Sequence, residues 1–303
     1  MHVVVAGGTG FIGRALCRSL SQKGHRVTIL TTNGRAGSQV FGTSVTTVHW
    51  NGRDGGAWEM SLEGADAVVN LAGAPIADGR WTKARKRLLT ESRVQLTRCL
   101  VEAISQRSAK PRVLISASGI GYYGPNDNAV LTETAPPGEG FLAELCIEWE
   151  RAAGRASDFG TRVVLLRTGM VLERDGGALP KMLLPFRLFV GGPIMPGTQW
   201  VSWIHRDDQV GLIEWALATP TVSGPVNAVA PEPERMQTFC STLGRVLHRP
   251  SWIPVPEAAL SLGLGELGTV MTTGQRVSPQ KPLVNGYVFR YPALEPALRA
   301  ILD

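Results

Sequence analysis

The sequence predicts an α/β fold in which a parallel β-sheet carries helices on both faces. Three observations lead to this prediction. Short runs of β-branched residues alternate with amphipathic helical stretches through the first half of the chain. A glycine-rich turn separates the first of these runs from the first helical stretch. After about residue 172 the chain becomes richer in glycine and proline, which is typical of a smaller, irregular unit.

The individual elements follow from apolar runs and from their periodicity. The expected strands are Val3–Ala6, Val27–Thr31, Val45–His49, Ala67–Leu71, Val113–Ser116 and Val163–Arg167, with a later one at Val226–Val229. The expected helices are Phe11–Lys23, Lys83–Gln106, Phe141–Ser157 and Asp208–Leu217. Because ligands of such sheets bind beyond the carboxyl ends of the strands, the segments that follow the strands are expected to line one crevice.

The turn after the first strand carries a nucleotide-binding pattern, which reads Gly7-Gly-Thr-Gly-Phe-Ile-Gly13. Gly7 permits a tight reversal, Gly10 lets the backbone approach a pyrophosphate, and Gly13 allows close packing of helix on strand. The N-terminus of the helix that follows offers unpaired N–H groups and a partial positive charge to phosphates. The segment therefore predicts dinucleotide binding; the alternative is a glycine-rich turn without a ligand.

The end of the second expected strand favours NADP (NADPH) over NAD. Sites for NAD usually place an Asp or Glu there, on the ribose hydroxyl. In this chain Thr31, Thr32 and Arg35 occupy that region, and the first acidic residue is Asp54. Hydroxyl groups and a guanidinium suit a 2′-phosphate. The alternative for Arg35 is a simple place in a loop.

Composition and charge restrict the class of protein. The net charge of +6 equals the charge of the first 53 residues, which contain six Lys and Arg and no acid. A phosphate-rich cofactor explains part of this excess, so nucleic acid is not expected as a partner, although the basic run from Arg80 to Arg87 leaves it as an alternative. The four cysteines form no Cys-x-x-Cys pair, so neither a disulfide framework nor a metal site is expected. No long apolar span and no signal peptide are found, which predicts a cytoplasmic protein without a membrane contact.

At this point the chain resembles the extended short-chain dehydrogenase/reductase superfamily. The matching segments are the glycine turn, Asp66-Ala-Val-Val-Asn-Leu-Ala-Gly73, Ser116-Ala-Ser118 with Tyr123-Gly124, and Trp203-Ile-His205 with Asp208. Further segments, Pro185–Pro193, Ser202–His205, Gly224–Ala228 and Gly274–Val277, look like an atypical branch called the epimerase family, related to NAD-dependent epimerases and dehydratases. The resemblance implies a Rossmann doubly wound parallel sheet with a small C-terminal α+β lobe.

The resemblance also implies a domain division and a set of site residues. The Rossmann domain is expected over 1–171, with a return of the chain near 200–230, and the substrate lobe over 172–303, with a family-specific tail from about 250. The expected cofactor-binding residues are Gly7, Thr9, Gly10, Phe11, Ile12, Gly13, Thr31, Thr32, Arg35, Leu71, Ala72, Gly73, Arg93, Ser116 and Val171.

The catalytic pair of the superfamily is missing from the sequence. Working members are understood to use Ser with Tyr-x-x-x-Lys, because the lysine charge lowers the pKa of the phenol. No Tyr-x-x-x-Lys occurs in this chain, and an alignment on Glu150 places Leu142 and Cys146 at the two positions. Cys146 is expected to be a packed thiol.

Several residues are candidates to replace the missing pair. Ser118, Tyr122 and Tyr123 are the candidate catalytic residues. The alternatives are a charge from Lys83, Arg85 or Arg93, and an acid–base pair of His205 and Asp208, each of which also has a purely structural explanation.

Two functions remain open from the sequence. One is an NADP-dependent oxidoreductase with non-standard acid–base groups that acts on an unidentified small-molecule substrate. The other is a catalytically silent protein that holds NADP for sensing or regulation. A monomer or a homodimer is compatible with both.

Overall fold

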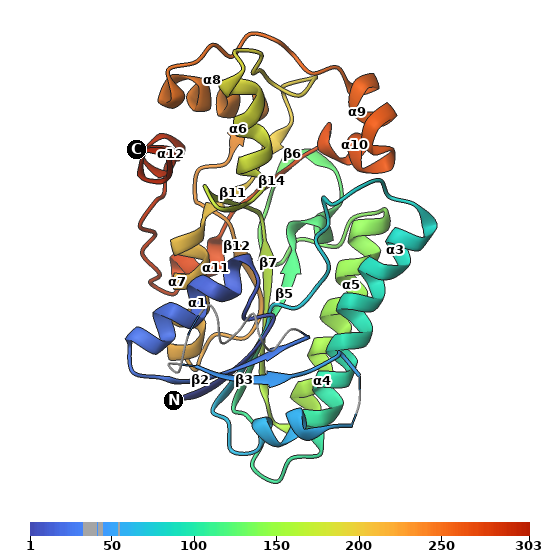
Figure 1. Ribbon diagram of the computed structural model, residues 1–303, viewed down its shortest axis with the longest axis vertical. Coiled ribbons are helices and arrows are strands. Elements are labelled where there is room, and N and C mark those ends of the chain that lie inside the picture. Colours follow the sequence, from blue (N-terminus) through green and yellow to red (C-terminus); the bar gives the residue numbers. More distant parts are fainter. Residues whose placement is uncertain (33–40, 42–44, 54) are drawn as a thin grey trace.

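The computed structural model describes residues 1–32, 41, 45–53 and 55–303 of the chain. Its centre is a seven-stranded sheet with the order β12-β7-β5-β4-β1-β2-β3, in which every neighbouring pair is parallel (Figure 1). The strands are β1 (His2–Ala6), β2 (Arg26–Thr31), β3 (Thr46–His49), β4 (Ala67–Asn70), β5 (Val113–Gly119), β7 (Arg162–Thr168) and β12 (Gly224–Ala228). This arrangement confirms the predicted Rossmann-type sheet.

Apolar packing on both faces explains why the central strands read as continuous apolar runs. In β1, Val3 and Val5 lie in one hydrophobic cluster, and Val4 and Ala6 lie in another. Successive side chains of a strand point to opposite faces, so a strand that is covered on both faces needs no polar alternation.

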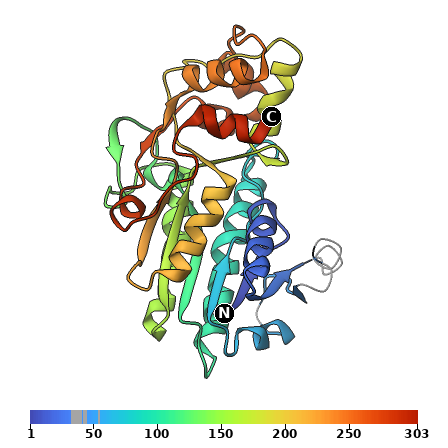
Figure 2. The same ribbon diagram turned by 90° about the vertical axis from the view of Figure 1, so that its left-hand side faces the viewer.

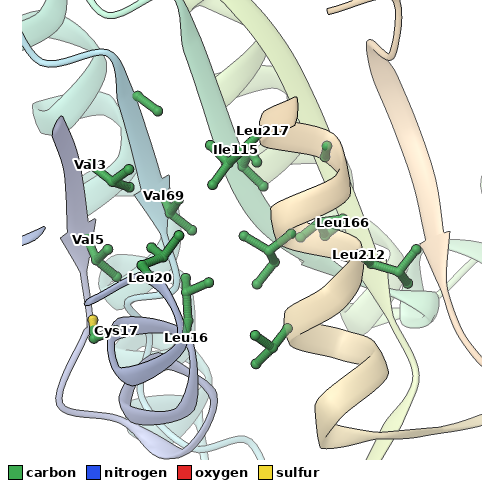
Figure 3. Close-up of a cluster of buried hydrophobic side chains, with 14 of the residues drawn as sticks. Val3, Val5, Leu16, Cys17, Leu20, Val69, Ile115, Leu166, Leu212 and Leu217 are labelled. Atoms are coloured by element: carbon green, nitrogen blue, oxygen red, sulfur yellow. The ribbon is translucent and has the colours of Figure 1, made fainter. Parts of the chain in front are cut away.

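Different helices cover the two faces of the sheet. On one face lie α1 (Phe11–Gln22) and α7 (Arg206–Ala218), and Figure 3 shows Leu16 and Leu20 of α1 over Val5 and Val69 of the sheet. On the other face lie α4 (Leu96–Ser105), α5 (Phe141–Gly154) and the 3₁₀ segments η1 (Ala57–Leu62) and η4 (Arg155–Phe159). Among the described residues, no helix combines the length and the apolar character that crossing a bilayer requires.

The helix expected over Lys83–Gln106 is confirmed to Ser105, but a π-helical turn interrupts its α-helical path. The segment consists of α3 (Lys83–Thr90), the π-helical turn η2 (Glu91–Gln95) and α4. The turn brings Ser92 and Arg93 to the end of β4, where the Ser92 hydroxyl accepts a hydrogen bond from the Ala74 N–H (3.1 Å) and Arg93 donates one to the Ala74 carbonyl (2.8 Å). Such π-turns are rare and occur often at functional sites.

Two smaller departures concern the ends of elements. The expected helix Phe141–Ser157 ends as an α-helix at Gly154 and continues as a 3₁₀ turn. Strand β5 extends to Gly119, so Ser116 and Ser118 lie within the strand and not beyond it.

A smaller lobe lies beyond the carboxyl ends of the strands (Figures 1 and 2). It has its own hydrophobic cluster, which includes Phe186, Trp203, Phe239 and Leu298. The remaining strands form small sheets: β8 (Met170–Glu173) with β9 (Gly176–Gly177) and β11 (Trp203–His205), β10 (Trp200–Val201) with β13 (Glu234–Arg235), and β6 (Asn126–Leu131) with β14 (Gln275–Val277). Within the described residues, the other helical segments are η3 (Ile120–Tyr123), α6 (Leu179–Arg187), α8 (Met236–Leu247), α9 (Glu257–Leu264), α10 (Glu266–Met271), α11 (Gln280–Val284) and α12 (Leu294–Leu302).

The C-terminal tail is tied back to the sheet domain. The carboxylate of Asp208, at the start of α7, accepts hydrogen bonds from the Arg290 N–H (2.8 Å), the Tyr291 N–H (2.9 Å) and the Tyr287 hydroxyl (3.1 Å). The ring of His205 stacks on Tyr291, with 3.9 Å between the ring centroids. These contacts hold the segment 287–291 against α7.

Close packing at Gly13 gives a direct test of the turn geometry. A Cβ atom on Gly13 would lie 2.2 Å from the Gly7 carbonyl oxygen and 2.7 Å from the Gly8 Cα atom. We expect Gly13→Ala to lower the free energy of unfolding by about 3 kcal/mol, as measured by urea titration, because backbone atoms cannot yield as a flexible side chain can.

The matched control is Gly154→Ala. Gly154 has helical backbone angles and open space around its Cα atom, so alanine is expected to leave the stability unchanged or to raise it by up to about 1 kcal/mol. Equal stability of the two variants would contradict the close packing at Gly13.

Candidate functional site

The glycine turn lies directly against the segment that follows β4. Gly7 has φ +78°, and a Cβ atom there would lie 2.9 Å from the Ala72 nitrogen and from the Leu71 carbonyl carbon. Only glycine therefore lets the ends of β1 and β4 approach this closely. The Gly10 N–H donates to the Gly7 carbonyl (3.0 Å), and Gly10 begins α1 without a side-chain cap.

The first turn of α1 contains no acidic residue. No negative side chain of the helix itself therefore offsets the free N–H groups and the positive end of the helix dipole. This combination is the usual backbone arrangement for binding phosphate.

The end of β2 presents hydroxyl groups to the same crevice. The Thr31 and Thr9 hydroxyl oxygens lie 3.3 Å apart, which joins β2 to the glycine turn. Thr31 is buried and Thr32, which follows the strand, is exposed. Arg35, the third residue predicted for this region, lies outside the described residues.

Arg93 is a buried cation on the other side of the 71–73 segment. Its guanidinium carbon lies 3.1 Å from the position that a Cβ atom on Gly73 would occupy, and 5.3 Å from the centroid of the Trp149 ring. Burial lowers the pKa of the guanidinium to about 10, so it is still charged at pH 7.

The charge of Arg93 is only partly compensated. Arg93 donates to the Leu89 carbonyl (3.3 Å) and the Ala74 carbonyl (2.8 Å), but its buried Nε atom makes no hydrogen bond within the described part of the chain, where no carboxylate pairs with it either. A buried charge in this state is costly unless an anion approaches it.

The hairpin of β8 and β9 covers Phe11 at the start of α1. A Cβ atom on Gly176 would lie 2.3 Å from the Phe11 ring, so the glycine allows this contact. Phe11 and Ile12 pack against the cluster that contains Val171, which is buried in β8. These three predicted cofactor residues therefore shape the crevice by packing around the turn.

Ser118 is hydrogen-bonded within a buried polar network. Its hydroxyl donates to Glu150 Oε1 of α5 at 2.7 Å. The same carboxylate receives Arg167 Nε and Nη2, both at 2.8 Å, and both side chains of this ion pair are less than 10% exposed. Burial opposes the charge of Arg167, but the hydrogen bonds to Glu150 outweigh it and hold the pKa of the guanidinium above its usual value. Ser116 is fully buried on the same strand, opposite Asn70 of β4.

The two predicted tyrosines have different environments. Tyr123 is buried, donates to Asn227 Oδ1 at 2.6 Å and accepts from Arg167 Nη1 at 3.1 Å. Burial raises the pKa of its phenol. The ring of Tyr122 is only partly buried, and the Arg167 guanidinium stacks on it at 3.4 Å. Tyr123 is therefore a member of the buried network, and Tyr122 lies at its border.

The positions of the missing pair are apolar. A Cβ atom on Gly121 would lie 2.9 Å from the Leu142 Cβ atom, and one on Gly119 would lie 3.7 Å from the Cys146 sulfur. Burial raises the pKa of the Cys146 thiol to about 11, which agrees with the expected packed, unreactive thiol.

The structure gives His205 and Asp208, the alternative acid–base pair, separate hydrogen-bond partners. His205 Nδ1 accepts the Asp207 N–H (3.0 Å) and caps α7, while Asp208 holds the C-terminal tail. Burial lowers the pKa of the His205 imidazole, which keeps the ring neutral at pH 7.

The sequence reasoning missed the partners of the central network. In the sequence, Glu150 serves only to align its helix with that of the superfamily, and Arg167 only ends an expected strand. An arginine inside an otherwise apolar central strand requires a partner and is the signal that points to such a pair.

Comparison with known proteins identifies the family. The model of the "NAD dependent epimerase/dehydratase family" matches residues 3–229, three quarters of the chain. The chain belongs to this family. A second model, of a domain of unknown function (DUF1731), matches residues 255–301 of this epimerase-family protein. Both matches confirm the resemblance seen in the sequence.

Two curated relatives and one solved structure are similar over almost the whole chain. The "Epimerase family protein SDR39U1 homolog, chloroplastic" of Arabidopsis thaliana is 43% identical over 100% of this chain and 87% of its own length. The "Epimerase family protein YfhF" of Bacillus subtilis is 40% identical over 100% and 98%. The crystal structure of human epimerase family protein SDR39U1 with NADPH superposes with a TM-score of 0.89 at 36% identity, over 99% of each chain.

Removal of the charge of Glu150 tests the ion pair. We expect Glu150→Gln to lower the free energy of unfolding by about 3–5 kcal/mol, because it leaves the buried Arg167 charge uncompensated. Urea unfolding at pH 7 measures this effect.

Glu148→Gln on the same helix is the control. Glu148 pairs with Arg98 and Arg151 at the surface, with 41% of its side chain exposed, so its loss is expected to change the stability by less than about 1 kcal/mol. An equally small effect of both substitutions would refute the importance of the buried pair.

Proposed function

We propose that this protein binds NADPH in the crevice at the carboxyl ends of β1, β2 and β4 and acts as an NADP-dependent oxidoreductase with non-standard acid–base groups. The observation that carries the proposal is the contact of the glycine turn with residues 71 and 72, backed by the buried positive charge of Arg93, which no carboxylate among the described residues pairs with. The substrate is a small molecule.

The residues of the crevice fit a dinucleotide. Gly7 and Gly13 permit the close backbone contacts that shape the turn, and Gly10 would let the backbone approach a pyrophosphate at the N-terminus of α1, whose first turn contains no acidic residue. On the far side of Gly73, Arg93 contributes a buried positive charge that would favour a phosphate bound nearby. Leu71, Ala72, Ser116 and Val171 would form the apolar and backbone walls.

The preference for NADPH rests on the end of β2 and on a relative. Thr31 and Thr32 take the place of the carboxylate that NAD sites use. The human relative, at 36% identity, was solved with NADPH. We retain Arg35 as a further contact to the 2′-phosphate on the basis of the sequence.

Proton transfer requires another group than the usual tyrosine and lysine. NADPH, when bound, supplies a hydride to a carbonyl carbon. Tyr123 donates its hydroxyl hydrogen to Asn227, so we assign proton donation to Tyr122. Ser118 would position the substrate oxygen by exchanging its hydrogen bond to Glu150 for one to that oxygen.

A silent NADPH-holding protein is the second candidate function. Two observations favour it. Leu142 and Cys146, beside Gly121 and Gly119, are apolar. The Ser118 hydroxyl is already hydrogen-bonded to Glu150. In that case the crevice would bind the cofactor for sensing or regulation.

We also propose that different parts of the chain bind the cofactor and the substrate. Residues 1–171, with the return near 200–230, would bind the cofactor, and 172–303 would bind the substrate; α7 and β12 support the return because they pack on the sheet of the first part. A cytoplasmic monomer or homodimer without nucleic acid remains our proposal for this chain, although the plant relative is named chloroplastic.

Calorimetry with NADPH and NADH tests the cofactor assignment. We expect the protein to bind NADPH more tightly, and Thr32→Asp to weaken NADPH at least about tenfold while NADH binding is kept, because a carboxylate repels the 2′-phosphate. Thr221→Asp is the control, since Thr221 is exposed and precedes the amino end of β12, away from the crevice. A preference for NADH in the unmodified protein would overturn the assignment.

Turnover separates the two candidate functions. Purified protein with NADPH and a panel of aldehydes and ketones should oxidise NADPH, and Tyr122→Phe should lower kcat by about 100-fold or more, as loss of a proton donor does. Tyr123→Phe should lower the stability and leave kcat within a few-fold. NADPH binding without turnover across the panel would favour the silent protein.

A further inference from the structure

A small cavity lies between the sheet domain and the C-terminal tail. Its volume is about 120 Å³, and its lining comes from η3 and the start of α5 on one side and from α10 on the other. Gly121 and Leu142 line the first side, and Glu266 and Val270 line the second. We propose that this cavity binds an apolar, ring-sized group of the substrate beside its reacting carbonyl, and that α10 is the wall that determines specificity. This inference rests on the proposed oxidoreductase function.

The position of the cavity connects it to the chemistry of the site. Leu142 occupies the place that the resemblance assigns to the catalytic tyrosine, and a Cβ atom on Gly121 would lie only 2.9 Å from the Leu142 Cβ atom. The cavity is therefore in contact with the start of α5 and with the turn that follows β5. A group held there lies next to the segment in which Ser118 and Tyr122 are found.

The lining is mainly apolar, and the polar atom of its aromatic side chains, Trp81 Nε1, already donates a hydrogen bond within the protein. The rings of Trp81 and Phe141 meet edge to face at 5.3 Å, and Trp81 Nε1 donates to the Ile76 carbonyl at 3.0 Å. Leu142 and Val270 complete this surface. Sugar hydroxyls placed against it would lose hydrogen bonds to water without replacement, whereas an alkyl or aryl group would gain from burial.

The charges at the cavity do not favour an anionic ligand. Glu266 is ion-paired with Lys86 of α3, whose ammonium group also lies 4.9 Å from the centroid of the Phe141 ring. Glu139 adds a further carboxylate to the lining. Gln275, whose neutral side chain carries amide N–H donors, also lines the cavity.

The size of the cavity points to one ring or a short alkyl chain. A dry apolar cavity of about 150 Å³ in another protein binds benzene, and sites for drug-sized ligands start at about 300 Å³. A wider, open hollow of about 890 Å³ adjoins the cavity and shares Pro125, Glu139 and Gly140 with it. The cavity itself therefore takes only the reacting end of a substrate.

Helix α10 belongs to the region that matches the domain of unknown function, 255–301. The ion pair of Glu266 with Lys86 attaches the helix to α3, and Gly265, just before it, packs against the side chain of Arg80 at 3.0 Å from a would-be Cβ atom. These contacts fix the wall opposite Leu142. The inference thus assigns a role in substrate selection to this region of the chain.

Binding of para-fluorobenzaldehyde, observed by fluorine NMR with and without saturating NADPH, tests the inference. We expect the probe to bind the unmodified protein, and Val270→Trp to weaken it at least about tenfold, because the indole would fill most of the cavity. The control is Met271→Trp, which changes the neighbouring, exposed residue of the same short helix and should leave the affinity within twofold. Urea midpoints of both variants check that they are folded.

The outcomes separate this inference from the proposed function. Equal affinity of the probe for both variants, no binding of the probe, or tighter competition by UDP-glucose than by the aldehyde would overturn the inference, even with NADPH bound normally. Weakening by Val270→Trp alone would support it. Probe binding in a protein that fails to bind NADPH would overturn the proposed oxidoreductase and leave the cavity assignment in place.

Discussion

The buried ion pair between Glu150 and Arg167 orients most of the polar groups in the middle of the site. Glu150 holds the Ser118 hydroxyl on β5, and Arg167 on β7 holds the phenol of Tyr123 and the face of Tyr122. The network continues through Asn227 of β12, whose N–H donates to Glu133, and Glu133 also accepts the Lys281 N–H at the start of α11. Two charges in the interior thereby connect the sheet, α5 and the tail.

This network gives a physical reason for the missing catalytic lysine. A lysine at position 146 would put a second cation into a buried space that already contains Arg93, since the Cys146 thiol and the Arg93 guanidinium interact. Glu150 is the buried carboxylate of α5, and Arg167 already binds both of its oxygens. A neutral thiol at this position avoids the repulsion.

Local patterns in the sequence predicted most of the fold, and long-range pairings remained hidden. The strand, the glycine turn and α1 are consecutive in the chain, so the geometry around Gly7 and Gly13 could be read from residues 3–20. The π-turn at Arg93 has no hydrophobic periodicity that could be recognised in the sequence. The contacts that favour it come from Ala74, on another segment. The pairing of Glu150 with Arg167 depends on α5 and β7 meeting, which no spacing in the sequence reveals. The cavity beside Leu142 needs α10, more than a hundred residues later in the chain.

The return of the chain to the sheet has a consequence for how the protein can assemble during synthesis. Strand β12 pairs with β7 along its whole length, yet 55 residues, which include part of the smaller lobe and α7, separate the two strands. Until β12 has left the ribosome, β7 is an unpaired edge of apolar residues, open to pairing with another chain. Asp208 in the first matched region accepts hydrogen bonds from the backbone of residues 290 and 291 in the second, so these contacts between the two regions form only when nearly all of the sequence is present.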